Sequence, residues 1–506
     1  MEARPGEGRL LSLFRRVRNM NLSSPRKLAP PSPLTFKRLA LALAVALAMA
    51  GCATRQVESD PITEMQVPDK WGGGAAADVA HAEQLWPDSD WWKQFGSGEL
   101  SSLVEEGQQN NFEIAAAFSR VKQAEAQARI AGAPLLPNVG LNANAARDLP
   151  LSGGSPTNSA GATLQVSYEI DFWGKNRAGV DAAEASLHAN RYDRETVALT
   201  VTSGIVSTYL QVLSLRDRLE IARQNVGNAE RVLKLVEAQS RAGSASPLDL
   251  ARQRSALANQ RQLIPDLQQQ EQDAQTALAI LLGRPPQNFM VQEKGLAKIQ
   301  MPRISAGLPS ELLTRRPDIR RAEANLAAAN ANVAVARAAL FPSITLTGST
   351  GAQSNALLSL FDGPNLFASL GAGLIAPIFD GGKLRNQRDL AIAQKEELVQ
   401  LYRQRVINSL SEVEKALGAI RSLEERYRLK IGEVDQARFA FELAEIRYRA
   451  GAEDLLVVLD TQRTLSEAQN QLGQIKLQRL QATVSLYKAL GGGWHDQAPG
   501  NGVVAP

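Results

Sequence analysis

The sequence lacks most of the residues from which active sites are built. Its 506 residues include one cysteine and three histidines, and aromatic residues make up only 5% of the chain. None of the histidines (His81, His188 and His495) lies in a metal-binding or nucleophile motif, and no glycine-rich phosphate loop occurs. A single cysteine excludes an internal disulfide. We therefore predict no enzyme activity, no cofactor and no metal.

A basic surface is also lacking outside the first residues. The net charge is +4, but residues 1–38 contain nine Lys or Arg against two Glu, which leaves −3 for the remainder of the chain. Nucleic-acid binding requires a basic patch on the folded domain. No nucleic-acid partner is predicted.

The basic leader runs into a short apolar segment. Residues 39–51 carry no charge and end in small residues, and they are too few to span a bilayer as a helix, which takes about 20 residues. This order is typical of a secretory signal. A buried core helix is a poorer alternative because nothing amphipathic surrounds the segment. The signal is predicted over 1–51, with Met20 as an alternative start to Met1.

Four segments have the period-two alternation of β-strands with one apolar face. They fall in two pairs, at about 137–147 and 161–172, and at about 342–352 and 366–379. Each pair is separated by a loop rich in Gly, Ser, Asn and Pro. Long helical patterns fill the rest of both halves, and Pro265 is expected to break or restart one of them.

The two halves are copies of one unit. Arg241-Ala242-Gly243 and Arg449-Ala450-Gly451 each end one helical run before another begins, and they are 208 residues apart. An Arg-Ala-Gly step of this kind indicates a helix C-terminus with Gly in the left-handed conformation. Other Gly and Pro positions recur at offsets of 205 and 208. The chain is therefore predicted to be an internal duplication.

Helix length limits how such a unit can fold. The pattern from Lys175 to Arg241 spans about 100 Å at 1.5 Å per residue, so it needs partners along its whole length. Two shorter helices placed end to end supply roughly that length. Each unit is then a helical rod with a two-stranded hairpin at one end and a turn at the other.

Four strands are too few to form a closed barrel with a lumen, and open sheet edges do not occur in hydrocarbon. The strands are nevertheless long enough for a tilted membrane crossing of about 9–11 residues. We therefore predict a mainly α fold with a small transmembrane β part, in which several chains pool strands and helices. A soluble sheet on a coiled-coil protein is the alternative.

Five stretches carry a resemblance to a known family, the TolC-like outer-membrane efflux proteins, and most closely to their lipid-anchored, OprM-type branch. Four run from the middle of the chain to its end, and Met49-Ala-Gly-Cys52 resembles a bacterial lipobox. The other four are Gly307-Leu-Pro-Ser-Glu-Leu-Leu-Thr-Arg-Arg-Pro-Asp-Ile319, Arg337-Ala-Ala-Leu-Phe-Pro-Ser-Ile344, Leu459-Asp-Thr-Gln-Arg463 and Leu486-Tyr-Lys-Ala-Leu-Gly-Gly-Gly-Trp494.

The resemblance implies a homotrimer with a 12-stranded β-barrel in the outer membrane and a 12-helix α-barrel in the periplasm. It implies a covalent lipid on Cys52, anchoring in outer-membrane lipid, a periplasmic adaptor (membrane fusion) protein and an inner-membrane transporter of the RND type. The function implied is the exit duct of a tripartite efflux pump for drugs or other toxic small molecules. A duct for type I protein secretion or metal efflux is the alternative, and a free thiol is the alternative for Cys52.

The resemblance also implies a gate at the periplasmic tip, formed by Tyr448, Leu456, Asp460 and Arg463. Asp249 and Arg252 begin the corresponding helix of the first unit, and their i,i+3 spacing places them on one helix face. Capping of this helix by Asp249, after Ser246 and Pro247, is an equal alternative to gating. The Arg-Ala-Gly turns at 241–243 and 449–451 are the expected contacts for the adaptor.

The predicted organisation has six parts. They are the signal (1–51), a lipid-anchored linker (52–96), repeat 1 (97–288, tip near 241–249), an inter-repeat linker at the equator (289–306), repeat 2 (307–494, tip near 449–460) and a tail (495–506).

Overall fold

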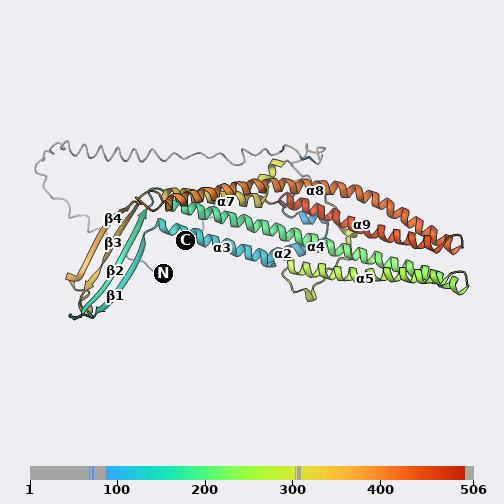
Figure 1. Cartoon of the computed structure of the whole chain (residues 1–506), viewed down its shortest axis with the longest axis horizontal. Helices are drawn as coiled ribbons and strands as arrows, with labels where there is room; N and C mark the ends of the chain where they lie inside the picture. The colour runs from blue at the N-terminus through green and yellow to red at the C-terminus, as the bar shows by residue number, and fades with distance from the viewer. Residues whose placement is uncertain (1–67, 69–70, 73–86, 303, 305–308, 496–506) are drawn as a thin grey trace, which may run out of the picture. The chain divides into compact units, whose positions relative to one another are not determined.

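The computed structural model describes residues 68, 71–72, 87–302, 304 and 309–495. The signal, Cys52 and most of the tail lie outside these residues. Each repeat contains two strands and a long helix followed by a returning helix, as predicted (Figure 1). Repeat 1 comprises α2 (Gly98–Asn110), α3 (Phe112–Gly132), β1 (Asn138–Asp148), β2 (Thr157–Ile170), α4 (Lys175–Arg241) and α5 (Pro247–Leu281); repeat 2 comprises α6 (Leu312–Arg315), α7 (Pro317–Ala338), β3 (Ser343–Ser354), β4 (Leu366–Ile375), α8 (Lys383–Arg449) and α9 (Leu455–Ala489).

The duplication is confirmed in the element lengths. Helices α4 and α8 both have 67 residues, α5 and α9 both have 35, and all four starts are displaced by 208. The strands β1 and β3 start 205 apart. The closing strand pairs, Asn138 with Ser167 and Ser343 with Ile375, enclose separations of 29 and 32. The second hairpin loop is therefore three residues longer, which accounts for the two offsets.

The four strands form one antiparallel sheet in the order β1-β2-β3-β4. Two hairpins are joined through β2 and β3, where Ile170 pairs with Ile344. Within the described part of the chain, β1 and β4 are the two edges of the sheet. The predicted strands are confirmed, although β4 ends at Ile375 rather than near 379, because Pro377 cannot donate to a strand ladder.

One face of this sheet is continuously apolar. Cross-strand partners on it include Leu141 with Leu164 and Ile344 with Leu374, whereas Gln165 pairs with Ser349 on the opposite face. Side chains alternate between faces in a strand, so the predicted period-two pattern is translated into an apolar and a polar side. Its exposed apolar residues include Val139, Leu141, Leu164, Leu346, Leu366, Leu370 and Leu374.

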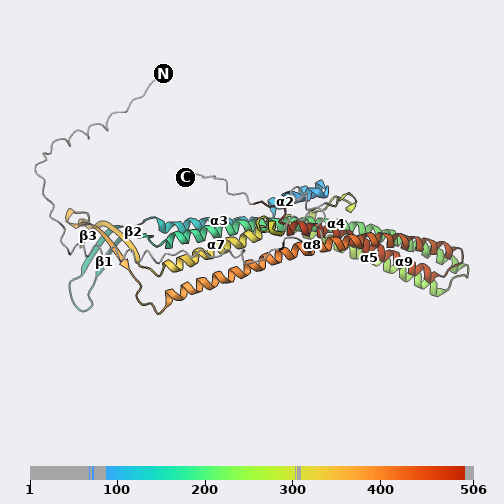
Figure 2. The same cartoon turned by 90° about the horizontal axis from the view of Figure 1, so that it is seen from above.

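Helix α4 packs against α5 near the tip and against α3 near the sheet on one side, and against α9 and α7 on the other. Helix α8 packs on α9 and α7 (Figures 1 and 2). The layers thus follow the order α3 with α5, α4, α7 with α9, and α8. The predicted end-to-end arrangement of the shorter helices is confirmed. An 18-residue window of α4 has a mean hydropathy of 1.4 and is half buried inside the chain, as its four neighbours require.

Pro265 does not break its helix, so that prediction was wrong. Helix α5 runs through it from Pro247 to Leu281. The pyrrolidine ring removes one backbone hydrogen bond, but Leu257 before it and Leu267 after it are both about 5% exposed. Packing on both sides of the proline keeps the helix continuous, because tertiary contacts outweigh the local cost of about 3 kcal/mol.

The residues just before α2 form part of the core. A 3-10 helix, η2 (Trp91–Phe95), buries Trp91, Trp92 and Phe95. The Trp91 ring stacks on Tyr487 of α9 with 4.6 Å between centroids. The prediction that tryptophans anchor this linker is confirmed for Trp91 and Trp92, which fasten it to the end of repeat 2; Trp86 lies outside the described residues.

Candidate gate at the helical tip

Both tip turns end their long helix in the same way. Gly243 and Gly451 have φ of 80° and 74°. The Ser244 N–H donates to the Gln239 carbonyl, and the Ala452 N–H donates to that of Arg447, at 2.9 Å in both cases. These bonds satisfy carbonyls that the helix end leaves free. All six Arg-Ala-Gly residues are exposed, as a docking surface requires.

The helices that leave the turns are capped differently. Ser246 and Asp249 form a capping box, in which Asp249 Oδ2 accepts the Ser246 N–H at 3.1 Å and the Ser246 hydroxyl at 2.7 Å. These bonds hold the pKa of Asp249 below its ordinary 3.8. In repeat 2 Asp454 caps α9 by accepting the Leu456 N–H at 2.8 Å. Asp249 therefore caps its helix, whereas Asp460 lies inside α9 and caps nothing.

Asp460 and Arg463 form an ion pair of 3.0 Å on the exposed surface of α9, with both side chains more than 60% exposed. Pairs of this kind contribute only about 0–1 kcal/mol. Arg252 lies at the position of repeat 1 that corresponds to Asp460, 208 residues earlier. The structure brings the two repeats together here, since Arg252, Leu456, Asp460 and Arg463 line one open groove of about 450 Å³ between α5 and α9.

Tyr448 lies apart from that groove. Its side chain is 7% exposed and packs in an apolar cluster with Val232 and Val236 of α4 and Leu455 and Val458 of α9. Burial raises its pKa, and the charges of Asp249 and Asp454 raise it further. Tyr448 therefore joins the two hairpins of one chain, while Leu456 and its repeat-1 counterpart Leu248 are each 57% exposed.

Sequence reasoning missed a charged link between the hairpins. Glu445 of α8 is 9% exposed and contacts Arg231 of α4 at 3.6 Å and Arg449 of the tip turn at 3.1 Å. The i,i+4 spacing of Glu445 and Arg449 was visible in the sequence, but the contact with Arg231 depends on the packing of α4 against repeat 2.

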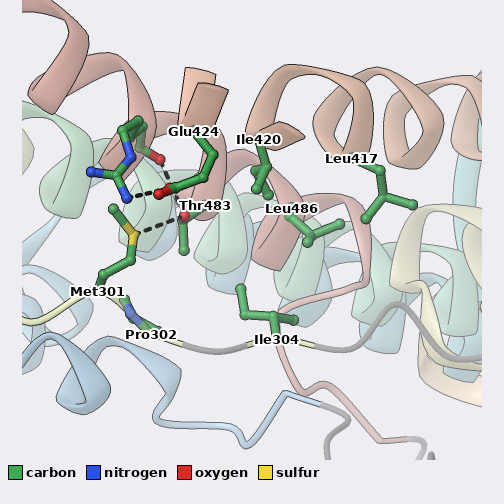
Figure 3. A pocket seen from close by; sticks show the side chains of 9 residues that line it. Met301, Pro302, Ile304, Leu417, Ile420, Glu424, Thr483 and Leu486 are labelled. Atoms are coloured by element: carbon green, nitrogen blue, oxygen red, sulfur yellow. Dashed lines mark hydrogen bonds and ion pairs between the residues drawn. The ribbon is translucent and has the colours of Figure 1, made fainter. Parts of the chain in front are cut away.

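The inter-repeat linker also meets hairpin 2 at a small cavity of about 140 Å³ (Figure 3). Met301 and Ile304 of the linker face Leu417 and Ile420 of α8, and the Thr483 hydroxyl of α9 donates to the Met301 sulfur at 3.5 Å. The linker therefore packs on the helices it connects, consistent with its predicted equatorial place.

Comparison with known proteins agrees with this architecture. The chain resembles the solved structure of the outer-membrane channel OprN, with a TM-score of 0.75 and 29% identity over 85% of this chain and 98% of that one. Strands, helix layers and tip thus define an outer-membrane channel rather than an enzyme. Two regions, 103–284 and 308–492, match the family model of the outer membrane efflux proteins. The chain belongs to this family.

Curated relatives cover nearly the whole chain. It is 45% identical over 92% of its length to all of the pyoverdine export outer membrane protein OpmQ of Pseudomonas putida. It is also 30% identical over 90% of its length to 98% of the cation efflux system protein CusC of Escherichia coli.

Proposed function

We propose that this chain is the exit duct of a tripartite efflux pump, working as a homotrimer that exports small molecules through a gate at the helical tip. The observation that carries the proposal is the sheet, which combines one continuous apolar face with two open edges. Unpaired edges are excluded from hydrocarbon. Pairing of β1 with β4 of the next chain removes them, and three chains supply 12 strands.

The helices support the same assembly. The outer layers of one protomer, α8 on one side and α3 with α5 on the other, expose large apolar side chains that a neighbouring chain would cover. On α8 they include Leu390, Leu401, Ile407, Leu429, Phe439 and Ile446; on α3 and α5 they include Phe112, Phe118, Ile130, Leu263 and Ile280. A trimer would close them into a 12-helix barrel.

In this assembly the exposed tip residues narrow the duct. Leu456 and Asp460 project from α9, Arg463 holds Asp460, and Arg252 contributes the opposite charge from repeat 1. Weak, exposed ion pairs suit a gate that a partner opens. The partners are a periplasmic adaptor at the Arg-Ala-Gly turns and an inner-membrane transporter of the RND type. A lipid on Cys52 anchors the chain in the outer membrane.

The gate is tested by conductance in planar bilayers. Asp460→Ala and Tyr448→Phe are each expected to raise the conductance severalfold, because they remove a charge at the constriction and a polar group between hairpins. Asp435→Ala, an exposed acidic residue of α8 outside the groove, is the matched control. Wild-type conductance in both gate variants would remove the assignment.

The assembly is tested by mass in detergent. A trimeric mass is expected for the wild type, and Leu370→Lys, which places a charge on the apolar face of β4, should abolish membrane insertion. A clean monomer for the wild type would contradict the pooled barrel.

The substrate is proposed to be a small molecule, with a siderophore of the pyoverdine class as the first candidate because a relative named for its export is 45% identical. Metal-ion efflux is the second candidate, supported by the relative CusC. Deletion of the gene should lower secreted siderophore or tolerance to toxic cations, and each assay excludes one candidate. Drug export would appear as a change in drug susceptibility.

A further inference from the structure

A band of buried polar side chains separates two apolar regions where α4 of hairpin 1 meets α9 of hairpin 2. Asn225 of α4 is 4% exposed and donates to Gln469 Oε1 at 3.0 Å and to Ser466 Oγ at 3.5 Å, both on α9. The Ser466 hydroxyl donates in turn to Gln260 of α5 at 3.1 Å. Three helices thus meet through amides and a hydroxyl.

The band continues along the same contact away from the tip. Arg218 Nε donates to Asn470 Oδ1 at 2.9 Å, and the buried Ser214 hydroxyl donates to the Gly473 carbonyl at 3.5 Å. A Cβ at Gly473 would lie 3.0 Å from Arg218 Cγ, so the helices approach closely here. We call these contacts, from Ser214 to Asn225 on α4 and from Ser466 to Gly473 on α9, the polar seam.

Apolar contacts flank the seam on both sides. Toward the tip, Val232 and Val236 of α4 pack with Leu455 and Val458 of α9. Toward the sheet, Ile205 and Tyr209 of α4 share a cluster with three residues of α9. These are Leu480, Val484 and Tyr487.

The same part of α4 is apolar where it holds its own hairpin. Leu215, Leu219 and Ala222 share a cluster with Leu267 and Ala274 of α5. One stretch of α4 therefore binds α5 through apolar side chains and α9 through polar ones. The duplication does not explain this difference, because the counterparts of Ser466 and Gln260 in the other repeat are Ala258 and Ala468.

We infer that the polar seam is the plane along which hairpin 2 moves over α4 when the gate opens, and that its side chains determine how readily the gate opens. This inference rests on the proposed function as a gated duct. Buried hydrogen bonds contribute only about 1 kcal/mol net, because water can replace the partner. An apolar interface has no such substitute and loses its contacts outright. Movement therefore costs least at the seam.

Asn225→Leu replaces a seam amide by an apolar side chain of similar size. We expect at least threefold fewer voltage-evoked openings in planar bilayers than for the wild type. Gln253→Leu is the matched control, because Gln253 is also buried but bonds the Ala229 carbonyl within hairpin 1, at 2.8 Å. Equal or more frequent openings for Asn225→Leu than for Gln253→Leu would overturn the inference.

A reversible cross-link tests the movement within one folded protein. In the Asn225→Cys/Ser466→Cys variant, oxidation joins α4 to α9, and the openings should fall at least tenfold and return on reduction. Each single-cysteine variant controls for the oxidant. Unchanged openings in the oxidised, cross-linked protein would refute movement at the seam, whereas a wild type without any conductance would instead refute the proposed duct.

Discussion

The joints at which the short helices of each repeat meet end to end have one backbone geometry and two chemistries. In repeat 1 Asn111 caps α3 and donates to the Leu281 carbonyl of α5 at 2.8 Å. In repeat 2 Arg316 precedes α7 and donates to the Ala489 carbonyl of α9 at 2.9 Å. Leu281 and Ala489 correspond at the offset of 208, as Asn111 and Arg316 do at 205.

The repeat-2 joint adds charge. Arg316, 6% exposed, forms two hydrogen bonds with Asp318, at 2.9 and 2.8 Å, and reaches Glu412 of α8 at 2.7 Å. Burial alone would raise the pKa of Asp318, but the hydrogen bonds and charge of Arg316 outweigh it and lower the pKa below 3.8. Repeat 1 joins two helices with a neutral amide, whereas repeat 2 joins three with a buried ion network. Duplication thus preserved the contact while its side chains diverged.

The largest expected effect breaks this network. Arg316→Ala leaves Asp318 and the Ala489 carbonyl without their donor, and we expect a loss of about 3–5 kcal/mol in unfolding free energy, as for other broken buried pairs. Denaturant titration of the purified protein in detergent measures it. The double variant Arg316→Met/Asp318→Leu removes both charges and should recover most of the loss; no recovery would contradict the electrostatic origin.

The next effect compares the joints with the tips. Gly491 and Gly283 have φ of 87° and 71°, and an added Cβ would lie 2.1 and 2.4 Å from the carbonyl oxygens of Arg315 and Asn110. Alanine at either joint glycine should cost about 1–2 kcal/mol in backbone strain and about 1–3 more in overpacking.

The matched variants are Gly451→Ala and Gly243→Ala at the tips, where no atom lies within 4 Å of the added Cβ. They should show the strain alone. Equal losses of unfolding free energy at joint and tip would contradict the close approach of the stacked helices.

Asn111→Ala tests the neutral joint. The side chain accepts the N–H groups of Glu113 and Ile114 besides donating to Leu281. Loss of a cap costs about 0.5–2 kcal/mol, so the expected destabilisation, measured by the same titration, is smaller than for Arg316→Ala. Asn111→Asp keeps the cap but not the donor, and it should separate the two roles. A loss as large as that of Arg316→Ala would remove the distinction between the joints.

The smallest effect is a dependence on pH. Because the folded pKa of Asp318 lies below its unfolded value, its contribution is complete above about pH 4 and is lost as pH falls through the folded pKa. At pH 4 the loss should stay below about 1 kcal/mol. The Arg316→Met/Asp318→Leu variant should lack this part of the acid dependence, and an unchanged profile would refute it.

The periodicities and the repeated Arg-Ala-Gly steps were enough to predict four strands, the long helices, their duplication and the exposed tip. These are local patterns, set by side-chain period and by glycine at helix ends. Pro265 was the exception, because packing outweighed a local rule. The choice between capping and gating for Asp249 also required coordinates, since both fit Ser246-Pro247-Leu248-Asp249.

Only the tertiary structure decided which helix faces meet. Arg316 and Ala489 are 173 residues apart, and Asn225 and Ser466 are 241 apart. A long helix presents several faces, and α4 uses one for α5 and another for α9, so neither contact follows from its own periodicity. The sequence by itself determined the elements and their repetition; the packing of four helix layers determined the joints, the groove and the polar seam.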